Sequence, residues 1–446
     1  MPSTIGQEHE QPFEIGVESP RYLSQQVEGI GGRIKERPED FLVEEIPLYQ
    51  PSGSGEHIYL FLEKRGLTTL QLRDAVAHHF GVDRRAVGHA GLKDKHAITR
   101  QVISVHCPGK APEDFPSFQH DRASVLWVDL HENKLERGHL AGNRFSIKVR
   151  GVDPLRVRDA KKTLDLLSEI GVPNRFGVQR FGFLMNNHLV GRALILGNHR
   201  QALDLLLSPK AGAPRGSVDS REAYRAGDFA RAYELMPKVF KLERAALRAL
   251  ARGDSPQKAV GAIDQTAAGF FISSFQSAVF NSVLNARVEN GTLGRLIAGD
   301  LAFVTKSRAS FLIQQEELDS DAGVLNDRLE RFEIAPSGPM WGTSMPRCEG
   351  RIADDEARAL ARSGVSPKDM ESCEQRDGFP MIGGDRRPLR IPVIDPQVEG
   401  GIDEHGSYIR CAFDLPRGSF ATTLMDEVMK QPTTAGGDDS EGKDGA

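Results

Sequence analysis

The stretch Gly-Asn-Arg-Phe-Ser-Ile-Lys-Val-Arg at residues 142–150 decides the fold class, because apolar and polar side chains alternate along it. A period of two is typical of a β-strand with one face on a core and one face open. Phe145, Ile147 and Val149 share the apolar face. The opposite face is basic and consists of Arg144, Ser146, Lys148 and Arg150. That face either contacts an anionic partner or simply meets water, and the alternation alone does not decide between the two.

A helix with clear end signals follows this strand. Asp153 is a good N-cap and Pro154 favours a first helical turn, while Gly171 and Pro173 end the helix. Between them a buried stripe recurs at helical spacing, made of Val157, Ala160, Leu164, Leu167 and Ile170. The next segment, which starts at Asn174, therefore begins in a loop at a firm helix end.

Further from this strand and helix, the chain changes character. Patterns typical of strands occur before residue 150, at 57–63, 97–106 and 123–130, and again after about residue 390, and a helix is expected over 68–80. Residues 200–382 are instead rich in helical patterns, including a helix over 268–290. The sequence thus predicts a mixed α/β domain that is interrupted by a mostly helical insertion. The predicted parts are a flexible acidic tail at 1–20, a discontinuous α/β domain at 21–199 and 383–430, the insertion at 200–382, and a second flexible acidic tail at 431–446.

The composition is that of a folded globular chain. Of the 446 residues, 39% are hydrophobic and 27% are charged, which excludes disorder of the whole chain. No stretch reaches the ~20 apolar residues of a membrane-spanning helix, so we expect no membrane partner. The N-terminal residues lack the positive charge and apolar core of a secretory signal. The four cysteines lie at least 25 residues apart, which argues against a disulfide framework and fits a reducing compartment. We therefore expect a cytoplasmic protein.

The net charge of −5, from 57 basic and 62 acidic residues, hides an uneven distribution. Both tails are acidic, whereas residues 134–162 hold nine Lys or Arg against three acids. A nearly neutral chain with local basic patches is compatible with a nucleic-acid partner. A solvated surface has the same composition, so the charge alone does not require that partner.

Residues 88–101, Gly-His-Ala-Gly-Leu-Lys-Asp-Lys-His-Ala-Ile-Thr-Arg-Gln, place a carboxylate where a loop turns into a strand. Asp94 stands between Lys93 and Lys95, and two ammonium groups favour its ionised form, so its pKa should fall. An ionised carboxylate suits a nucleophile or a base rather than a general acid. The alternative is an exposed turn aspartate with salt-bridge partners.

Residues 174–182, Asn-Arg-Phe-Gly-Val-Gln-Arg-Phe-Gly, combine two Phe-Gly pairs with amide and guanidinium side chains. Glycine lets the backbone approach a ligand closely. A phenyl ring offers a face for a nucleobase, and an amide can read the polar edge of that base. The alternative is a glycine-rich loop with two phenylalanines in the core.

Several enzyme classes leave no trace in the sequence. It contains no His-Glu-x-x-His, Walker-type or dinucleotide-binding motif and no serine nucleophile elbow. The sequence therefore argues against a nucleotide-driven or metal-dependent enzyme.

Several segments resemble, in chain order, the TruD-type tRNA pseudouridine synthases. Residues 91–101 are similar to that family's catalytic GxKDxxAxTxQ motif, and residues 174–182 to its NxFGxQRFG motif, with Arg175 where tyrosine is common. Weaker agreements with PEDFxVxE, GPLxG, GxRR and LPxGsYAT occur at 38–45, 338–342, 384–387 and 415–422. The resemblance covers about residues 30–430, which is all but the tails.

This resemblance implies a fold and a reaction. The fold is a pseudouridine-synthase catalytic domain on a mixed, largely antiparallel sheet, with an inserted, mostly helical TRUD domain. In the reaction a uridine of tRNA, expected to be uridine 13 of the D-arm, becomes pseudouridine. The glycosidic bond breaks, the uracil turns in the pocket, and C5 rejoins the ribose. The resemblance implies no cofactor and no metal, and we expect a monomer with tRNA as its partner.

The resemblance also implies roles for individual residues. Asp94 matches the essential aspartate, which Lys93 would keep charged. Asn174 and Phe176 match residues that hold the flipped base. Further aromatic positions of the pocket wall are matched by Phe41 and Phe420. Contacts to the RNA backbone are expected from Arg144, Lys148, Arg180, Arg386 and Arg387, although the last three could instead brace acidic groups.

Two other functions fit the same motifs. One is a catalytically silent protein that binds or folds tRNA on this scaffold, and the other is a synthase that acts on another RNA. The intact Lys-Asp-Lys turn argues against the silent protein. The sequence does not identify the target uridine.

Overall fold

The computed structural model describes residues 20–376 and 382–431, which divide into two compact units. We call residues 22–172 with 391–431 the sheet unit, and residues 173–390 with 20 and 21 the helical unit. The two tail predictions, 1–20 and 431–446, lie outside the described residues except for Pro20 and Gln431. Each unit is described by itself.

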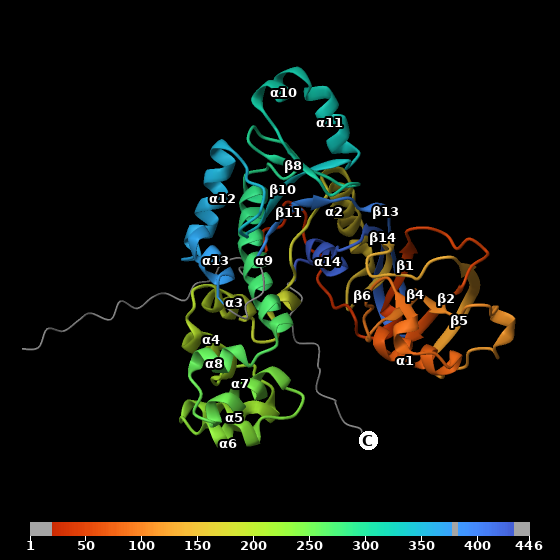
Figure 1. Cartoon of the computed structure of the whole chain (residues 1–446). Helices are drawn as coiled ribbons and strands as arrows, with labels where there is room; N and C mark the ends of the chain where they lie inside the picture. Colours follow the sequence, from red (N-terminus) through yellow and green to blue (C-terminus); the bar gives the residue numbers. More distant parts are fainter. Residues whose placement is uncertain (1–19, 377–381, 432–446) are drawn as a thin grey trace, which may run out of the picture. The chain divides into compact units, whose positions relative to one another are not determined.

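The sheet unit is built on one eight-stranded sheet (Figure 1). The strand order is β13-β14-β6-β1-β4-β2-β5, with β3 paired to β4. Only β1 and β4 run parallel, with Leu42 opposite Ile98, so the sheet is mixed and largely antiparallel, as predicted. The strands are β1 (Phe41–Pro47), β2 (His57–Arg65), β3 (Val87–His89), β4 (Ile98–His106), β5 (Ala123–His131), β6 (Leu140–Arg150), β13 (Ile394–Asp403) and β14 (Gly406–Pro416).

Three helices pack on this sheet, and their ends follow the sequence signals. They are α1 (Thr69–Phe80), α2 (Val157–Ile170) and α14 (Ala421–Met429). Thr68 and Gln71 form a capping box at the start of α1, and Gly81 ends it with φ 65°. Asp153 caps the short 3-10 turn that leads into α2. A core forms where α2 and α14 cover the apolar side of β1, β6 and β14.

The alternation in β6 holds, with one correction. Phe145, Ile147 and Val149 are buried as predicted. Arg150, expected on the open basic face, is only 4% exposed, because its guanidinium pairs with the carboxylates of Asp40 and Asp403 at 2.6 Å each. A charge at a strand end can turn inward when buried partners neutralise it.

The helical unit surrounds the long helix α9 (Figure 1). Its helices are α3 (Asn187–Ile195), α4 (His199–Leu207), α5 (Val218–Arg225), α6 (Phe229–Leu235), α7 (Lys241–Ala251), α8 (Pro256–Gly261), α9 (Gln265–Glu289), α10 (Gln315–Ser320), α11 (Ala322–Glu330), α12 (Gly350–Arg362) and α13 (Pro367–Glu374). A four-stranded sheet adds β11 (Asp385–Pro388), β10 (Ile334–Met340), β8 (Leu301–Val304) and β9 (Ser310–Leu312), in that order. The short strands β7 (Val172–Pro173) and β12 (Arg390–Ile391) lie where the chain passes from one unit to the other.

Helix α9 is apolar because it is the centre of a core. By length and composition it is the one helix among the described residues that could cross a membrane, which the sequence reading did not anticipate. In its most apolar window, however, 72% of the residues are buried inside the protein. Its packing against α3 requires Gly191, since a Cβ there would lie 2.0 Å from the carbonyl oxygen of Phe271.

The chain passes between units at 172/173 and 390/391, whereas the sequence placed the domain boundaries at 199/200 and 382/383. Residues 173–199 join the helical unit because α3 packs on α9, and Phe181 and Leu194 contribute to the core of that unit. Strand β11 joins it by pairing with β10. The division into a catalytic domain and a TRUD insertion stays a prediction.

Candidate active site

Asp94 lies in the loop just before β4, in the sheet unit, and several bonds fix this loop. The backbone N–H of Lys93 donates to Oγ1 of Thr69, at the start of α1, over 2.9 Å. The buried ammonium of Lys64, on β2, donates to the backbone carbonyl of Asp94 over 2.9 Å. The position of Asp94 thus depends on two other elements of the sheet unit, α1 and β2.

The carboxylate of Asp94 is held from both sides. Its Oδ2 lies 2.5 Å from the ammonium of Lys35, and its Oδ1 accepts the backbone N–H of His96 over 2.9 Å. Burial alone would raise the pKa of Asp94, but these two hydrogen bonds and the charge of Lys35 outweigh it. The pKa of Asp94 is therefore below its usual value, and the carboxylate is ionised at neutral pH. The side chain stays 32% exposed, which leaves it accessible to a ligand.

The cation that holds Asp94 in its charged form is Lys35 and not Lys93, which corrects the sequence prediction. The ammonium of Lys93 is 3.0 Å from Oε2 of Glu45 and donates to Oδ1 of Asn143 over 2.5 Å. The side chains of Lys93 and Glu45 are 5% and 1% exposed, so this is a buried ion pair. The direction of the pKa shift of Asp94 was predicted correctly, but its cause was not.

Lys35 has two further features that mark it. Its backbone has φ 60°, a left-handed conformation that is uncommon for a residue other than glycine and that often occurs at functional sites. Its ammonium also lies 4.7 Å from the ring centre of Phe41. Sequence reasoning missed Lys35, although it stands three residues before the segment that resembles the family's PEDFxVxE motif.

The two aromatic residues predicted in this unit differ in their surroundings. Phe41 is 4% exposed and meets the ring of Phe145 edge-on, so most of it belongs to the core beneath Lys35. Phe420 is 48% exposed at the start of α14. Within the described residues no aromatic contact joins Phe420 to Phe41. Phe41 thus lies beside Lys35, the partner of Asp94, and the role of Phe420 stays a prediction.

The two basic residues predicted on β6 are already paired with acids. Arg144 donates two hydrogen bonds to the carboxylate of Asp414, at 2.9 and 3.0 Å, yet its side chain remains 56% exposed. The ammonium of Lys148 is 2.8 Å from Asp403 and 4.3 Å from the ring centre of Tyr408. Neither positive charge is uncompensated, and their contacts to RNA stay predictions.

In the helical unit, Asn174 follows β7 and is 5% exposed. Its Nδ2 donates to the carbonyl of Pro388 over 2.8 Å, and its Oδ1 accepts from the guanidinium of Arg387 over 2.5 Å. The side chain thus joins the 174–182 loop to β11, and part of its hydrogen-bonding capacity is used within the protein.

Phe176 is held by α9 and faces two cations. The side-chain amide of Asn281 accepts the backbone N–H of Phe176 and donates to its carbonyl, each over 2.9 Å. The half-buried ring meets Phe280 edge-on at 5.6 Å. The guanidinium groups of Arg387 and Arg180 lie 4.3 and 5.6 Å from its centre. Asn281 is a second residue that sequence reasoning missed, because a buried asparagine inside an apolar helix carries no local signal.

Neither of these guanidinium groups has a carboxylate within 4 Å among the described residues. Arg180 donates instead to the hydroxyls of Ser277 and Ser273 and lies 4.9 Å from the ring centre of Phe270. Burial lowers the pKa of Arg180. Burial, with repulsion from Arg308 and Arg180, lowers the pKa of Arg387 to about 10. Two positive charges thus lie against one ring, and no described carboxylate compensates them.

Arg386 is the clearest correction among the predicted RNA contacts. Its side chain is 1% exposed, and its guanidinium donates to both carboxylate oxygens of Glu356, at 2.7 and 2.8 Å. Further bonds go to the hydroxyl and the carbonyl of Ser337. Arg386 therefore braces α12 against β10, which is the role the sequence offered as the alternative.

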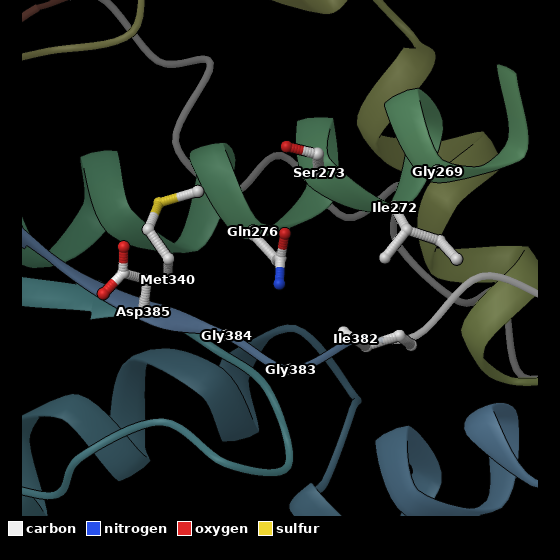
Figure 2. Close-up of a pocket in the computed structure, with 9 residues that line it drawn as sticks. All are labelled: Gly269, Ile272, Ser273, Gln276, Met340, Ile382, Gly383, Gly384 and Asp385. Atoms are coloured by element: carbon white, nitrogen blue, oxygen red, sulfur yellow. The ribbon is translucent and has the colours of Figure 1, made fainter. Parts of the chain in front are cut away.

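A cavity of about 350 Å³ lies beside α9 in the helical unit (Figure 2). Its lining is Gly269, Ile272, Ser273, Gln276, Met340, Ile382, Gly383, Gly384 and Asp385. In Figure 2 the amide of Gln276 points into this space, but its Nε2 already donates to the carbonyl of Trp341 over 2.6 Å. No predicted site residue lines the cavity.

Comparisons with known proteins agree with one another. The family model for tRNA pseudouridine synthase D (TruD) matches residues 17–428. The tRNA pseudouridine synthase D of Geobacter sulfurreducens is 40% identical over 417 residues, 92% of this chain and 97% of the relative. That of Thermus thermophilus is 34% identical over 410 residues, 92% of each chain. A crystal structure of the putative tRNA pseudouridine synthase D from Methanosarcina mazei superposes with a TM-score of 0.79 at 28% identity, covering 92% of this chain and 96% of that one. With its mixed α/β fold and an ionised aspartate in the predicted motif, the chain belongs to the TruD family of tRNA pseudouridine synthases.

Proposed function

We propose that this protein converts uridine 13 of the tRNA D-arm to pseudouridine, with Asp94 as the catalytic carboxylate. Its family makes it a tRNA pseudouridine synthase, an isomerase that acts on uridine in tRNA. The proposal adds the position of the uridine, the roles of the residues, and action as a cytoplasmic monomer without cofactor or metal.

The observation that carries the proposal is the state of Asp94. The residue stands in the motif that matches the family's catalytic loop, half-exposed and ionised by Lys35. Isomerisation breaks the bond between N1 and C1′, forms a bond between C5 and C1′, and moves the C5 proton to N1. A carboxylate could take part either by attacking a carbon atom or by removing a proton. Both roles require the ionised form of the carboxylate. The ammonium of Lys35 keeps the carboxylate of Asp94 ionised at neutral pH.

The helical unit contributes binding in this proposal. A uridine inside a folded tRNA has to leave its stack before it can react, and an aromatic face offsets part of that cost. Phe176 is half-exposed and is held by Asn281, so its ring is fixed and still available. Arg180 and Arg387 have no carboxylate partner in the part of the chain that the structure describes, and a phosphate of the same RNA would compensate their charges. Asn174 positions Arg387 and retains some capacity to bind the base.

The test is direct. Purified protein is incubated with unmodified tRNA, and pseudouridine is mapped chemically to a single nucleotide. The proposal expects conversion at position 13 by the wild type and none by Asp94→Asn. Conversion at another tRNA position would refute uridine 13 as the target, while the isomerisation of uridine in tRNA would stand. Conversion only in another RNA would refute the substrate, and binding without conversion would favour the silent tRNA-binding protein.

A further inference from the structure

Lys64 is a buried cation that the proposed chemistry does not use. It lies near the end of β2 and is 1% exposed. Its ammonium donates to the carbonyl of Leu67 over 2.6 Å and to that of Asp94 over 2.9 Å. An ammonium that leaves water loses much solvation free energy, so a lysine with such surroundings needs a reason to be there.

We propose that Lys64 is a positioning residue for Asp94, which it holds by tying the backbone of the Asp94 loop to the start of α1. This rests on the proposed function, because it matters for turnover only if Asp94 carries out the chemistry. Lys64 touches neither the carboxylate nor the substrate in this proposal and acts only through the backbone.

The geometry supports this role on both sides of the bond. Leu67 directly precedes Thr68, the N-cap of α1, so the ammonium joins the Asp94 peptide to the beginning of that helix. The bond from the Lys93 N–H to Thr69 attaches the preceding peptide to the same helix turn. The loop is therefore fixed at two successive peptides, while Lys35 and His96 fix the carboxylate itself.

Charge makes this attachment sensitive to pH. Burial lowers the pKa of Lys64 to about 8, opposed by the negative charge of Asp94 and assisted by the positive charge of Lys93. Across the sheet, Lys64 faces Thr99 on β4 and Ala123 on β5, which carry no charge. As pH rises through about 8 the ammonium loses its proton and its charge-assisted bonds weaken. Turnover should therefore fall on the alkaline side even though Asp94 remains ionised.

The experiment compares Lys64→Met and Lys64→Arg with the wild type. Single-turnover pseudouridine formation is measured with enzyme in excess, beside filter binding of tRNA. We expect Lys64→Met to form pseudouridine about 100-fold more slowly, the scale of a misplaced reacting group, with its Kd for tRNA unchanged. Lys64→Arg keeps the charge at every pH and should recover part of the rate and lose the alkaline decline.

Lys430→Met is the matched control. The ammonium of Lys430 also donates to two backbone carbonyls in the sheet unit, those of Ser24, at 2.7 Å, and Val27. Its removal deletes the same kinds of bond next to α14 and not next to Asp94. It should lower thermal stability and leave the rate per folded molecule unchanged.

Two results would overturn the proposal. One is a Lys64→Met rate within about threefold of wild type per folded molecule, a barrier change too small for a positioning role. The other is an alkaline limb that is the same in wild type and Lys64→Arg, and this comparison decides the matter even if Lys64→Met does not fold. Asp94→Asn runs beside them. If it is active, the proposed function fails, and if it is inactive while Lys64→Met is fully active, only the role of Lys64 fails.

Discussion

The charged side chains around Asp94 and those around Phe176 differ in how they are paired. Near Asp94 each buried cation has an anionic or carbonyl oxygen to bind, as in the pairs of Lys35 with Asp94 and Lys93 with Glu45. Near Phe176 the guanidinium groups of Arg180 and Arg387 rest on rings and on neutral oxygens. In the first cluster each of these positive charges has an oxygen partner, whereas the two guanidinium groups of the second have no carboxylate within 4 Å among residues 20–376 and 382–431.

We interpret this difference as a division between the residues that carry out the reaction and the residues that bind RNA. A carboxylate that must be ionised at all times needs a permanent cation, because a partner that arrived with the substrate would leave its pKa high beforehand. A surface for RNA benefits from the opposite arrangement, since positive charge left uncompensated in the free protein becomes compensated by phosphate. The predictions below test this division.

The largest effect is expected for Asp94→Asn. The amide keeps the size of the side chain but supplies no charged oxygen, so turnover should fall by about 10³-fold or more while tRNA still binds. Single-turnover pseudouridine formation and filter binding measure the two quantities. Asp94→Glu should also be impaired, since the longer arm misplaces the charge. A rate for the Asn variant within about tenfold of wild type would exclude Asp94 as the catalytic group.

The second effect concerns the cation that holds Asp94. In Lys35→Met the burial of Asp94 is no longer opposed by the hydrogen bond and the charge of Lys35, so the pKa of Asp94 should rise. Because the ionised form is the active one, the acidic limb of the rate profile should move to higher pH. Lys35→Arg restores the charge and should move the limb back. An acidic limb that is the same in Lys35→Met and wild type would contradict the assignment of Lys35.

The third test distinguishes a binding ring from a core ring. Phe176→Ala should reduce tRNA binding or turnover by about 1–3 kcal/mol of lost stacking, with a smaller loss of folding stability. Phe280→Ala is the matched control, because that ring is 0% exposed and packs edge-on against Phe176. It should cost about 3–5 kcal/mol of unfolding free energy. Urea midpoints and turnover per folded molecule separate the two readings, and Phe176 is a core residue if its stability loss equals that of Phe280.

The fourth effect is a change in salt dependence. If Arg387 binds a phosphate, Arg387→Met should reduce the slope of log Kd against log salt concentration by about 0.7–0.9. Arg200→Met is the control, because Arg200 also lies over a ring, that of Tyr224, but pairs with Asp204. Its slope should match that of wild type. Equal slopes for all three proteins would remove Arg387 from the RNA surface.

The smallest effect is expected for deletion of the two acidic tails. Residues 1–16 and 432–446 lie beyond the family match, and their sequences are acidic. Their deletion should leave turnover and melting temperature unchanged and lower the Kd for tRNA slightly, because less negative charge then repels the RNA. A cooperative loss of folding on deletion would show that the tails support the fold.

Sequence patterns predicted the structural features that are determined by residues close together in the chain. The cap and end of α1, the alternation of β6 and the exposed loop of Asp94 all follow from signals within a few positions. They could not predict pairings between distant residues. Lys35 stands 59 residues from Asp94, and only the parallel pairing of β1 with β4 brings their segments together.

The same limit applies to burial. Arg150 and Lys64 both stand in strands where a charged residue normally points to water, and the partners that bury them come from other elements. The change to helical patterns after about residue 200 likewise did not show that the core around α9 takes up residues of α3. The boundary at 199/200 followed from that change in pattern, and it stays a prediction.

The strand order of the sheet unit also determines when the sheet can be completed during synthesis of the chain. Strand β6 pairs with β14, and Phe145 is opposite Phe413, so the sheet needs a strand that is translated long after its first members. At about 5–20 residues per second, the interval is roughly 10–50 s on the ribosome. Meanwhile residues 173–390 emerge as one continuous segment that contains the core around α9. The half-finished sheet exposes the edge of β6 during this interval, and an exposed edge is a site for wrong pairing. A chaperone that covers nascent strands would therefore matter more for the sheet unit than for the helical unit.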